Sequence, residues 1–344
     1  MLMKRIVLFF VVIVWSFIST AQDVHFSQMR FSPFTVNPGL AGLEGKIQGI
    51  VNYRSQWNSV AAPFTTLGAS FDMRFEPFRR DGGYLAGGIN FFHDVAGDLN
   101  MTTSNVNLNL AYHLPINSES TIGLGMQAGY AQRGLGSSDG LWESQYNGST
   151  FDQAIASGES FQSMNFGHID AAAGVVYNYN SLSNNSFNSG GFRLSAGLSV
   201  FHINRPSYSF ITGGEDDLHM RYSGFVRGAF NLGDSKWQML PGAYYQQQGG
   251  HREIYAGSYF QYTINGGSQR TGFKQNFSIA YGAYYRLGDA FVNKLLVNFA
   301  EYSIGMAYDL NVSSLTQASR GRGGIEFMLR YNLTEMRTTR ARIN

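Results

Sequence analysis

The chain has 344 residues, of which 14% are charged, 15% are aromatic and 41 are glycine. Soluble domains carry roughly 25% charged residues and about 7% glycine, so this chain is poor in solvated charge. The formal net charge of +2 and the lack of a basic, aromatic-interleaved patch argue against a nucleic-acid partner. The absence of cysteine excludes disulfides, thiolate metal sites and a cysteine nucleophile.

The N-terminus predicts export from the cytoplasm. Two basic residues precede an apolar run from Ile6 to Ile18, and the small residue Ala21 ends the segment. This arrangement is typical of a secretory signal peptide, so residues 1–21 are predicted to be cleaved off before Gln22. An uncleaved anchor helix is the alternative, and the shortness of the apolar run disfavours it.

Residues 22–44 precede the first predicted strand. They contain Pro33 and Pro38, which exclude a regular central strand because proline cannot donate to a sheet ladder. Two interpretations stay open for this segment: a plug inside a barrel or a periplasmic lead.

Period-two alternation recurs along the rest of the chain. In "TIGLGMQAGY", residues 121–130, apolar side chains alternate with glycines and one glutamine; in "NVNLNLAYH", residues 105–113, they alternate mainly with asparagines. Such segments are strands with two unlike faces. A strand exposed to water would carry Lys, Glu or Thr on its second face. We therefore predict an all-β fold: a single transmembrane antiparallel barrel with lipid outside and a narrow or filled lumen.

About fourteen segments of this kind can be placed within residues 45–334. An even number is required if both termini of the chain lie in the periplasm, as we predict. In that register the long connections 136–167, 203–218 and 311–321 are extracellular, and the basic tail 335–344 is periplasmic. The segments are 46–54, 64–75, 84–93, 102–113, 120–133, 168–179, 192–202, 219–232, 237–247, 253–264, 274–286, 289–299, 301–310 and 322–333.

No motif predicts catalysis. The seven histidines lack the H-E-x-x-H spacing of a zinc site, no G-x-S-x-G is present, and "GGEDD" at 213–217 lacks the ligand spacing of a calcium loop. We expect no catalytic residue, cofactor or metal, and hence no enzyme. The pairs Tyr244–Tyr245 and Tyr284–Tyr285 are expected to mark interfacial girdles.

Six stretches in this order carry a resemblance: "HFSQMRFSPFTVNPGLAG", "YRSQW", "GLSVFHINRPSYSF", "LPGAYYQQQGGHREIYAG", "YRLGDA" and "IGMAYDLNVSSLTQASRGRGGIEFML". They resemble the PorP/SprF family of outer-membrane proteins of the Bacteroidota type IX secretion system, from His25 to Tyr331. The segment from Gly136 to Phe166 shows no pattern of that family.

The resemblance implies an integral outer-membrane barrel that works with the type IX machinery. Its implied partner is a secreted protein with a type IX C-terminal domain, notably a large adhesin, that is exported and retained at the surface. Some members are also associated with the periplasmic motor and the gliding apparatus.

The predicted topology places a set of polar and aromatic residues at outer strand ends, where they could grip an emerging polypeptide. Local hydrogen bonds that fix loop folds are an equally weighted interpretation of motifs such as "NRP". A porin or solute channel is the alternative function. The candidate partner-binding residues are Arg54, Gln56, Trp57, His202, Asn204, Arg205, Gln248, His251 and Asp289.

Overall fold

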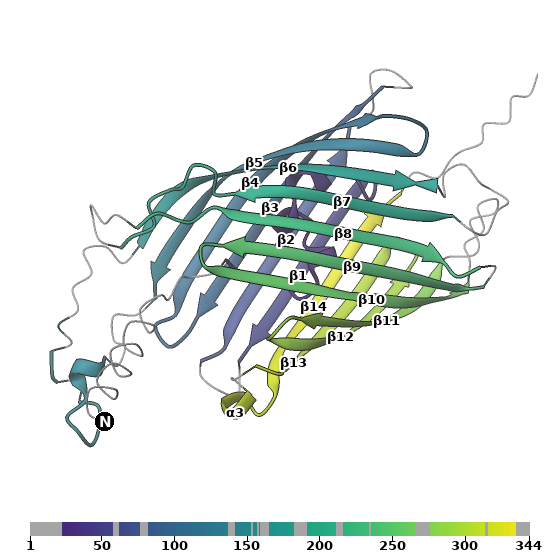
Figure 1. Cartoon of the computed structure of the whole chain (residues 1–344). Helices are drawn as coiled ribbons and strands as arrows, with labels where there is room; N and C mark the ends of the chain where they lie inside the picture. The colour runs from purple at the N-terminus through teal and green to yellow at the C-terminus, as the bar shows by residue number, and fades with distance from the viewer. Residues whose placement is uncertain are drawn as a thin grey trace, which may run out of the picture.

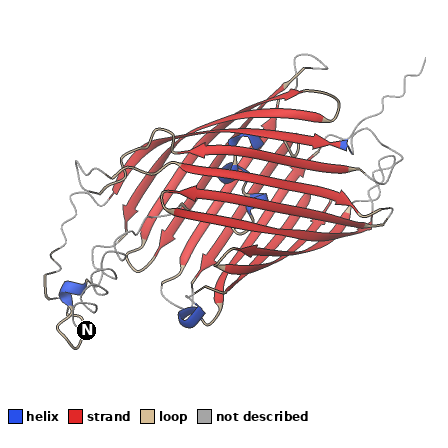
Figure 2. Ribbon diagram, in the orientation of Figure 1, coloured by secondary structure: helices blue, strands red, loops and turns tan. Residues whose placement is uncertain are grey.

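The alternating segments form fourteen strands, as the sequence predicts (Figures 1 and 2). They are β1 (Ile47–Gln56), β2 (Phe64–Arg74), β3 (Tyr84–Ala96), β4 (Met101–Pro115), β5 (Ser120–Leu135), β6 (Asn165–Asn180), β7 (Phe192–Phe201), β8 (Arg221–Asn231), β9 (Trp237–Gln248), β10 (His251–Asn265), β11 (Phe277–Arg286), β12 (Ala290–Phe299), β13 (Tyr302–Asn311) and β14 (Arg322–Leu333). Short helices are η1 (Met29–Phe31), α2 (Pro33–Val36), η2 (Pro38–Leu40), η3 (Glu143–Gln145) and α3 (Thr316–Ser319).

The computed structural model describes residues 23–57, 62–75, 82–136, 142–152, 154–156, 158, 165–181, 191–210, 216–233, 235–265, 276–313 and 316–334. The predicted signal peptide and basic tail therefore lie outside the described residues, as does part of "GGEDD". Within the described ranges, no helix is both long enough and apolar enough to cross a membrane.

Each strand pairs antiparallel with its neighbours in sequence, and β1 closes the barrel against β14. The closing register runs from Ile47 opposite Leu333 to Gln56 opposite Gly324. Closure satisfies the backbone groups that an open sheet edge would leave unpaired, which is the condition for a sheet to sit in lipid.

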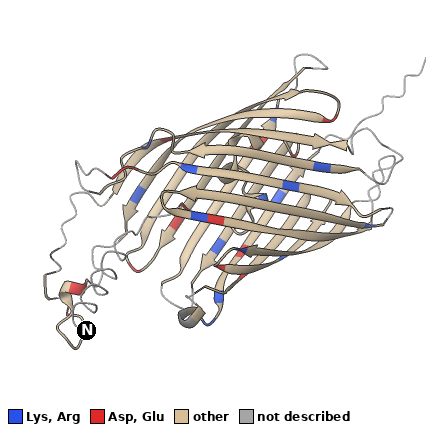
Figure 3. Cartoon of the chain, viewed as in Figure 1, with Lys and Arg blue, Asp and Glu red and all other residues tan. Residues whose placement is uncertain are grey.

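The two faces of each strand behave as the alternation predicts. On β4, Leu108 and Leu110 are 66% and 52% exposed, whereas Asn107 and Asn109 are each 4% exposed. The exposed apolar side chains form the lipid-facing surface, and the amides point into the barrel. Most of the strand length carries neither basic nor acidic residues (Figure 3).

The predicted girdle is wrong for one member of each tyrosine pair. Tyr244 and Tyr284 are 5% and 3% exposed and point into the barrel, whereas Tyr245 is 40% exposed. Consecutive residues of a strand face opposite sides, so two adjacent tyrosines cannot both lie on the lipid surface.

The lengths of the connections distinguish the two ends of the barrel. The long connections 136–164, 202–220 and 312–321 share one end, here called the outer end. The short turns 116–119 and 300–301 lie at the other, the periplasmic end, where β1 begins and β14 ends. The connections 181–191 and 266–276 are long for that end, and the turns 249–250 and 287–289 are short for the outer end. This is the asymmetry expected of an outer-membrane barrel.

Candidate functional site

Residues 23–44, here called the plug segment, lie inside the lumen of the barrel. Between Phe26 and Gly42 every residue is buried except Arg30 and Thr35, which are half-buried. Its short helices lie inside the ring of strands (Figure 2). Pro33 begins α2 and Pro38 begins η2, positions where the missing amide hydrogen costs nothing. The sequence left two positions open for these residues, inside the barrel or in the periplasm. In the structure they lie inside the barrel.

A buried ion cluster holds the plug segment at Ser27. Arg54 pairs with Asp309 at 3.1 Å and with Glu326 at 3.2 Å, and Arg286 pairs with Asp309 at 3.2 Å. The Ser27 amide donates to Glu326 at 2.7 Å and its hydroxyl donates to Asp309 at 2.8 Å. Arg54 is 1% exposed. This position corrects the prediction that Arg54 is a surface contact, because its side chain is buried in the barrel and its two terminal nitrogens already pair with Glu326 and Asp309.

A second cluster holds the plug segment at the outer end. Asp23 accepts from Arg221 at 2.9 Å and from Gln248 at 3.1 Å, and lies 2.6 Å from His202. The other ring nitrogen of His202 lies 2.9 Å from Asp170. Burial alone would lower the pKa of His202, but the two carboxylates raise this pKa to about 9. His202 and Gln248 are therefore buried and bind the plug segment to the wall; they are not exposed contacts for a partner.

The position of Asp23, the first described residue, at the outer end contradicts the prediction of a periplasmic N-terminus. The plug segment begins among the outer ends of β7 to β9 and descends through the lumen to Glu44, which precedes β1 at the periplasmic end. The barrel then begins at the periplasmic end, as predicted.

Glycines on the lumen face let the plug segment approach the wall. A Cβ at Gly125 would lie 2.2 Å from the Gly39 nitrogen, and one at Gly174 would lie 2.3 Å from the Asn37 side-chain oxygen. The Asn37 amide donates to the carbonyls of Val175 at 3.1 Å and of Leu198 at 2.9 Å. The glycine-rich face of "TIGLGMQAGY" is thus the seat of the plug segment.

Three of the predicted residues lie at the outer rim: Gln56 ends β1, Trp57 follows it, and Asp289 lies between β11 and β12. Gln56 and Trp57 are half-buried, and the Trp57 ring meets Phe64 edge-on at 4.7 Å. Asp289 is also half-buried and pairs with Arg286 at 2.9 Å. Trp57 keeps part of its ring available to a partner, whereas the Asp289 carboxylate is already engaged.

The remaining predicted residues lie in or beside the outer connections. Asn204 is exposed, but its side chain accepts from the Ala171 amide and donates to the Ile169 carbonyl. The Arg205 side chain is 54% exposed and reaches Asp217 only at 3.9 Å. His251 is half-buried at the start of β10. Asn204 therefore stabilises the connection after β7, and Arg205 has a guanidinium group that a partner could contact.

An aromatic cluster at the same end was missed from the sequence. Phe166 meets Phe210 at 4.9 Å and Tyr208 at 5.6 Å, and His168 meets Tyr208 at 5.7 Å. The Arg133 guanidinium lies 4.5 Å from the centre of the Tyr208 ring. These residues come from β5, β6 and the connection after β7. The only indication of this cluster in the sequence is the stretch "RPSYSF", which does not predict which residues contact Tyr208.

Solved barrels match this chain at low sequence identity and with low TM-scores. BamA from Haemophilus ducreyi lacking POTRA domains 1–3 is 11% identical over 84% of this chain and 70% of its own, with a TM-score of 0.43. A Pseudomonas aeruginosa FadL homologue is 10% identical over 83% and 90%, with a TM-score of 0.45. The CymD monoaromatic hydrocarbon channel is 10% identical over 89% and 94%, with a TM-score of 0.45. A comparison with curated protein sequences gave no match.

The comparison with family models identifies the family of the chain, which the solved barrels do not. The model for the type IX secretion system membrane protein PorP/SprF matches residues 18–331. This range includes the plug segment and nearly the whole of the barrel, and it confirms the resemblance seen in the six sequence stretches. The chain belongs to the PorP/SprF family of type IX secretion system membrane proteins, with an outer-membrane β-barrel fold.

Proposed function

We propose that this barrel supports type IX secretion by binding the C-terminal domain of a secreted protein at its outer end and anchoring that protein at the cell surface. The secreted protein is proposed to be a large adhesin, and other secretion or motor components are proposed as further partners. The proposal involves binding and no catalytic step.

The position of the plug segment inside the lumen is the observation that supports this proposal. The plug segment is fastened to the wall at Asp23, Ser27 and Asn37, along the height of the barrel. A porin or solute channel needs a continuous water-filled path, and the plug segment occupies that path. The accessible polar and aromatic groups of the outer end are then better suited to binding than to selecting solutes.

Trp57 and Arg205 are the contacts that we expect to contribute most. A half-buried tryptophan offers rigid apolar area, and an exposed arginine can make charge-assisted hydrogen bonds to carboxylates or carbonyls. Truncation of such an anchor costs about 2 kcal/mol or more, which corresponds to a roughly thirtyfold loss of affinity.

The experiment measures where the secreted partner is found in cells that carry Trp57→Ala or Arg205→Ala. We expect both variants to insert normally, as judged by a heat-modifiable gel shift, and to release the partner into the medium. Tyr302→Ala is the matched control, because Tyr302 is an exposed aromatic residue at the opposite end of the barrel. Wild-type retention of the partner by both outer variants would contradict the assignment.

A further inference from the structure

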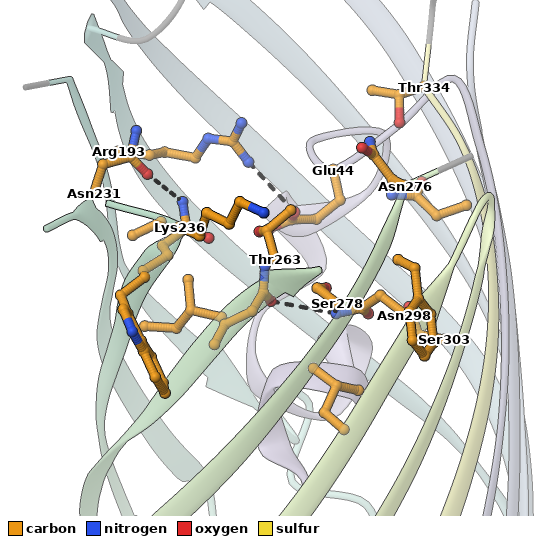
Figure 4. Close-up of a pocket in the computed structure, with 18 of the residues that line it drawn as sticks. Glu44, Arg193, Asn231, Lys236, Thr263, Asn276, Ser278, Asn298, Ser303 and Thr334 are labelled. Carbon is orange, nitrogen blue, oxygen red and sulfur yellow. Dashed lines mark hydrogen bonds and ion pairs between the residues drawn. The ribbon is translucent and has the colours of Figure 1, made fainter. Parts of the chain in front are cut away.

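A cavity of about 860 Å³ opens at the periplasmic end of the barrel (Figure 4). Strands β7 to β14 supply its walls, and the plug segment closes its inner side with Arg30, Phe31 and Glu44. Ligand pockets typically have volumes of about 300–1,000 Å³. The cavity therefore has the size of a binding site, and it lies at the end opposite to the proposed surface contact.

The described lining of this cavity carries an excess of positive charge. Glu44 lies 2.7 Å from Arg227 and 4.0 Å from Arg193. Burial alone would raise the pKa of Glu44, but the neighbouring arginines, Arg227 first, lower this pKa to about 2. The acid is thus ionised and already has a partner. The basic lining residues are Arg30, Arg193, Lys236 and Arg330, and the acidic ones are Glu44 and Glu301.

Two of the arginines that line the cavity have a buried donor without a hydrogen-bond partner among the described residues. The donors are Nη1 of Arg30 and Nε of Arg330. A buried polar group without a partner is unfavourable. A ligand of this cavity would therefore be expected to offer acceptors to the two guanidinium groups.

The size and charge of the cavity favour a peptide over inorganic phosphate. A cavity of about 860 Å³ is much larger than one phosphate ion, and a peptide supplies carboxylate acceptors together with backbone amide donors. The wall of the cavity also carries side-chain amides and hydroxyls that now bond to one another, as Gln238 does with Asn231 at 2.8 Å and Asn298 with Ser278 at 3.0 Å. Such groups can exchange these bonds for bonds to a peptide backbone.

We propose that the periplasmic cavity binds an acidic peptide segment presented from the periplasm, with the guanidinium groups of Arg30, Arg193 and Arg330 holding its carboxylates. Guanidinium groups suit this role because they bind carboxylates through two parallel hydrogen bonds. The inference does not depend on the outer-end function, since the two sites lie at opposite ends of the barrel and use different residues.

The test measures binding of a fluorescein-labelled hexaglutamate peptide to the full chain in detergent at low salt. We expect saturable binding that weakens with added salt, and no binding of the matched hexaglutamine peptide. Arg193 and Lys236 lie at the open side of the cavity and are partly exposed, so Arg193→Gln combined with Lys236→Gln should fold normally. This double variant should bind the peptide about tenfold more weakly or worse.

Arg252→Gln is the control, because Arg252 is an exposed arginine near the outer end. It should bind hexaglutamate as the wild type does. Equal binding of the two peptides, or unchanged affinity in the double variant, would overturn the proposal. Displacement of the peptide by inorganic pyrophosphate at a tenfold lower concentration than unlabelled hexaglutamate would also overturn it, because it would assign the cavity to phosphate.

Discussion

Single charged residues inside the barrel are fixed by specific partners. Arg54 is 1% exposed and lies between Asp309 and Glu326. Removal of one member of a buried ion pair leaves the other charges uncompensated, which is usually more costly than the pair is stabilising. The plug segment joins this cluster through Ser27, so the charges of the wall also position the plug.

Arg54→Met should therefore destabilise the protein strongly. Loss of a partner from a buried ion pair typically costs about 3–5 kcal/mol, and we expect the midpoint temperature of the heat-modifiable gel shift to fall. Arg205→Met is the control, since Arg205 is exposed and reaches Asp217 only at 3.9 Å; a surface change of this kind stays within about 0.5 kcal/mol. Equal midpoints for the two variants would show that the Arg54 cluster is not stabilising.

His202 should make the outer fastening of the plug segment dependent on pH. Its folded-state pKa of about 9 lies above the ordinary value of 6.5, chiefly because of Asp23. The protonated ring therefore stabilises the fastening fully below about pH 6.5, and this stabilisation is lost as the pH rises through about 9. The effect is on the order of 3 kcal/mol.

Hydrogen exchange of the amides of residues 23–28 measures this effect. After correction for the intrinsic exchange rate, we expect protection to fall as the pH rises from about 6.5 to above 9. His202→Gln should show weaker protection at low pH and little change with pH. If the wild type and the variant have the same pH profile, the His202 interaction does not control the fastening.

At the level of elements, the plug segment and the wall are matched in shape. Glycines at positions such as Gly125 leave space for the backbone of η2, and the short helices of the plug segment fill that space. Protein interiors are packed so densely that a single added side chain lowers the stability of the folded state. A larger residue on this face should therefore displace the plug segment without opening the barrel sheet.

Gly125→Val tests this match. A Cβ at Gly125 would lie 2.2 Å from the Gly39 nitrogen, and overpacking typically costs about 1–3 kcal/mol. We expect exchange of the amides of Asn37 and of residues 39–41 to accelerate by about tenfold or more. Gly49→Val is the control, because a Cβ there meets nothing within 4 Å. Unchanged exchange in Gly125→Val would contradict the close seating of η2.

At the level of the whole molecule, alternation was sufficient to predict the barrel. The two faces of a transmembrane strand differ so strongly that the fourteen segments and their outward apolar faces could be predicted from the sequence. Loop lengths then gave the orientation. The glycine face of residues 121–130 also indicated a narrow or filled lumen, although it did not identify the occupant.

The sites were less predictable than the fold. Alternation gives the face of a side chain but not its partner, so Arg54, His202 and Gln248 were assigned to the surface although they fasten the plug segment. The cluster around Tyr208 and the periplasmic cavity combine residues from distant strands. Their composition depends on strand stagger and on the path of the plug segment, and period-two patterns specify neither.

We propose that the plug segment closes the barrel, so that the protein binds partners and does not conduct solutes. Conductance of the purified full chain in planar bilayers tests it most directly, with a variant lacking residues 23–43 as the open control. We expect little or no steady current from the full chain and measurable conductance from the deletion variant. Large, stable, ion-selective current steps from the full chain would contradict the claim and would favour a porin.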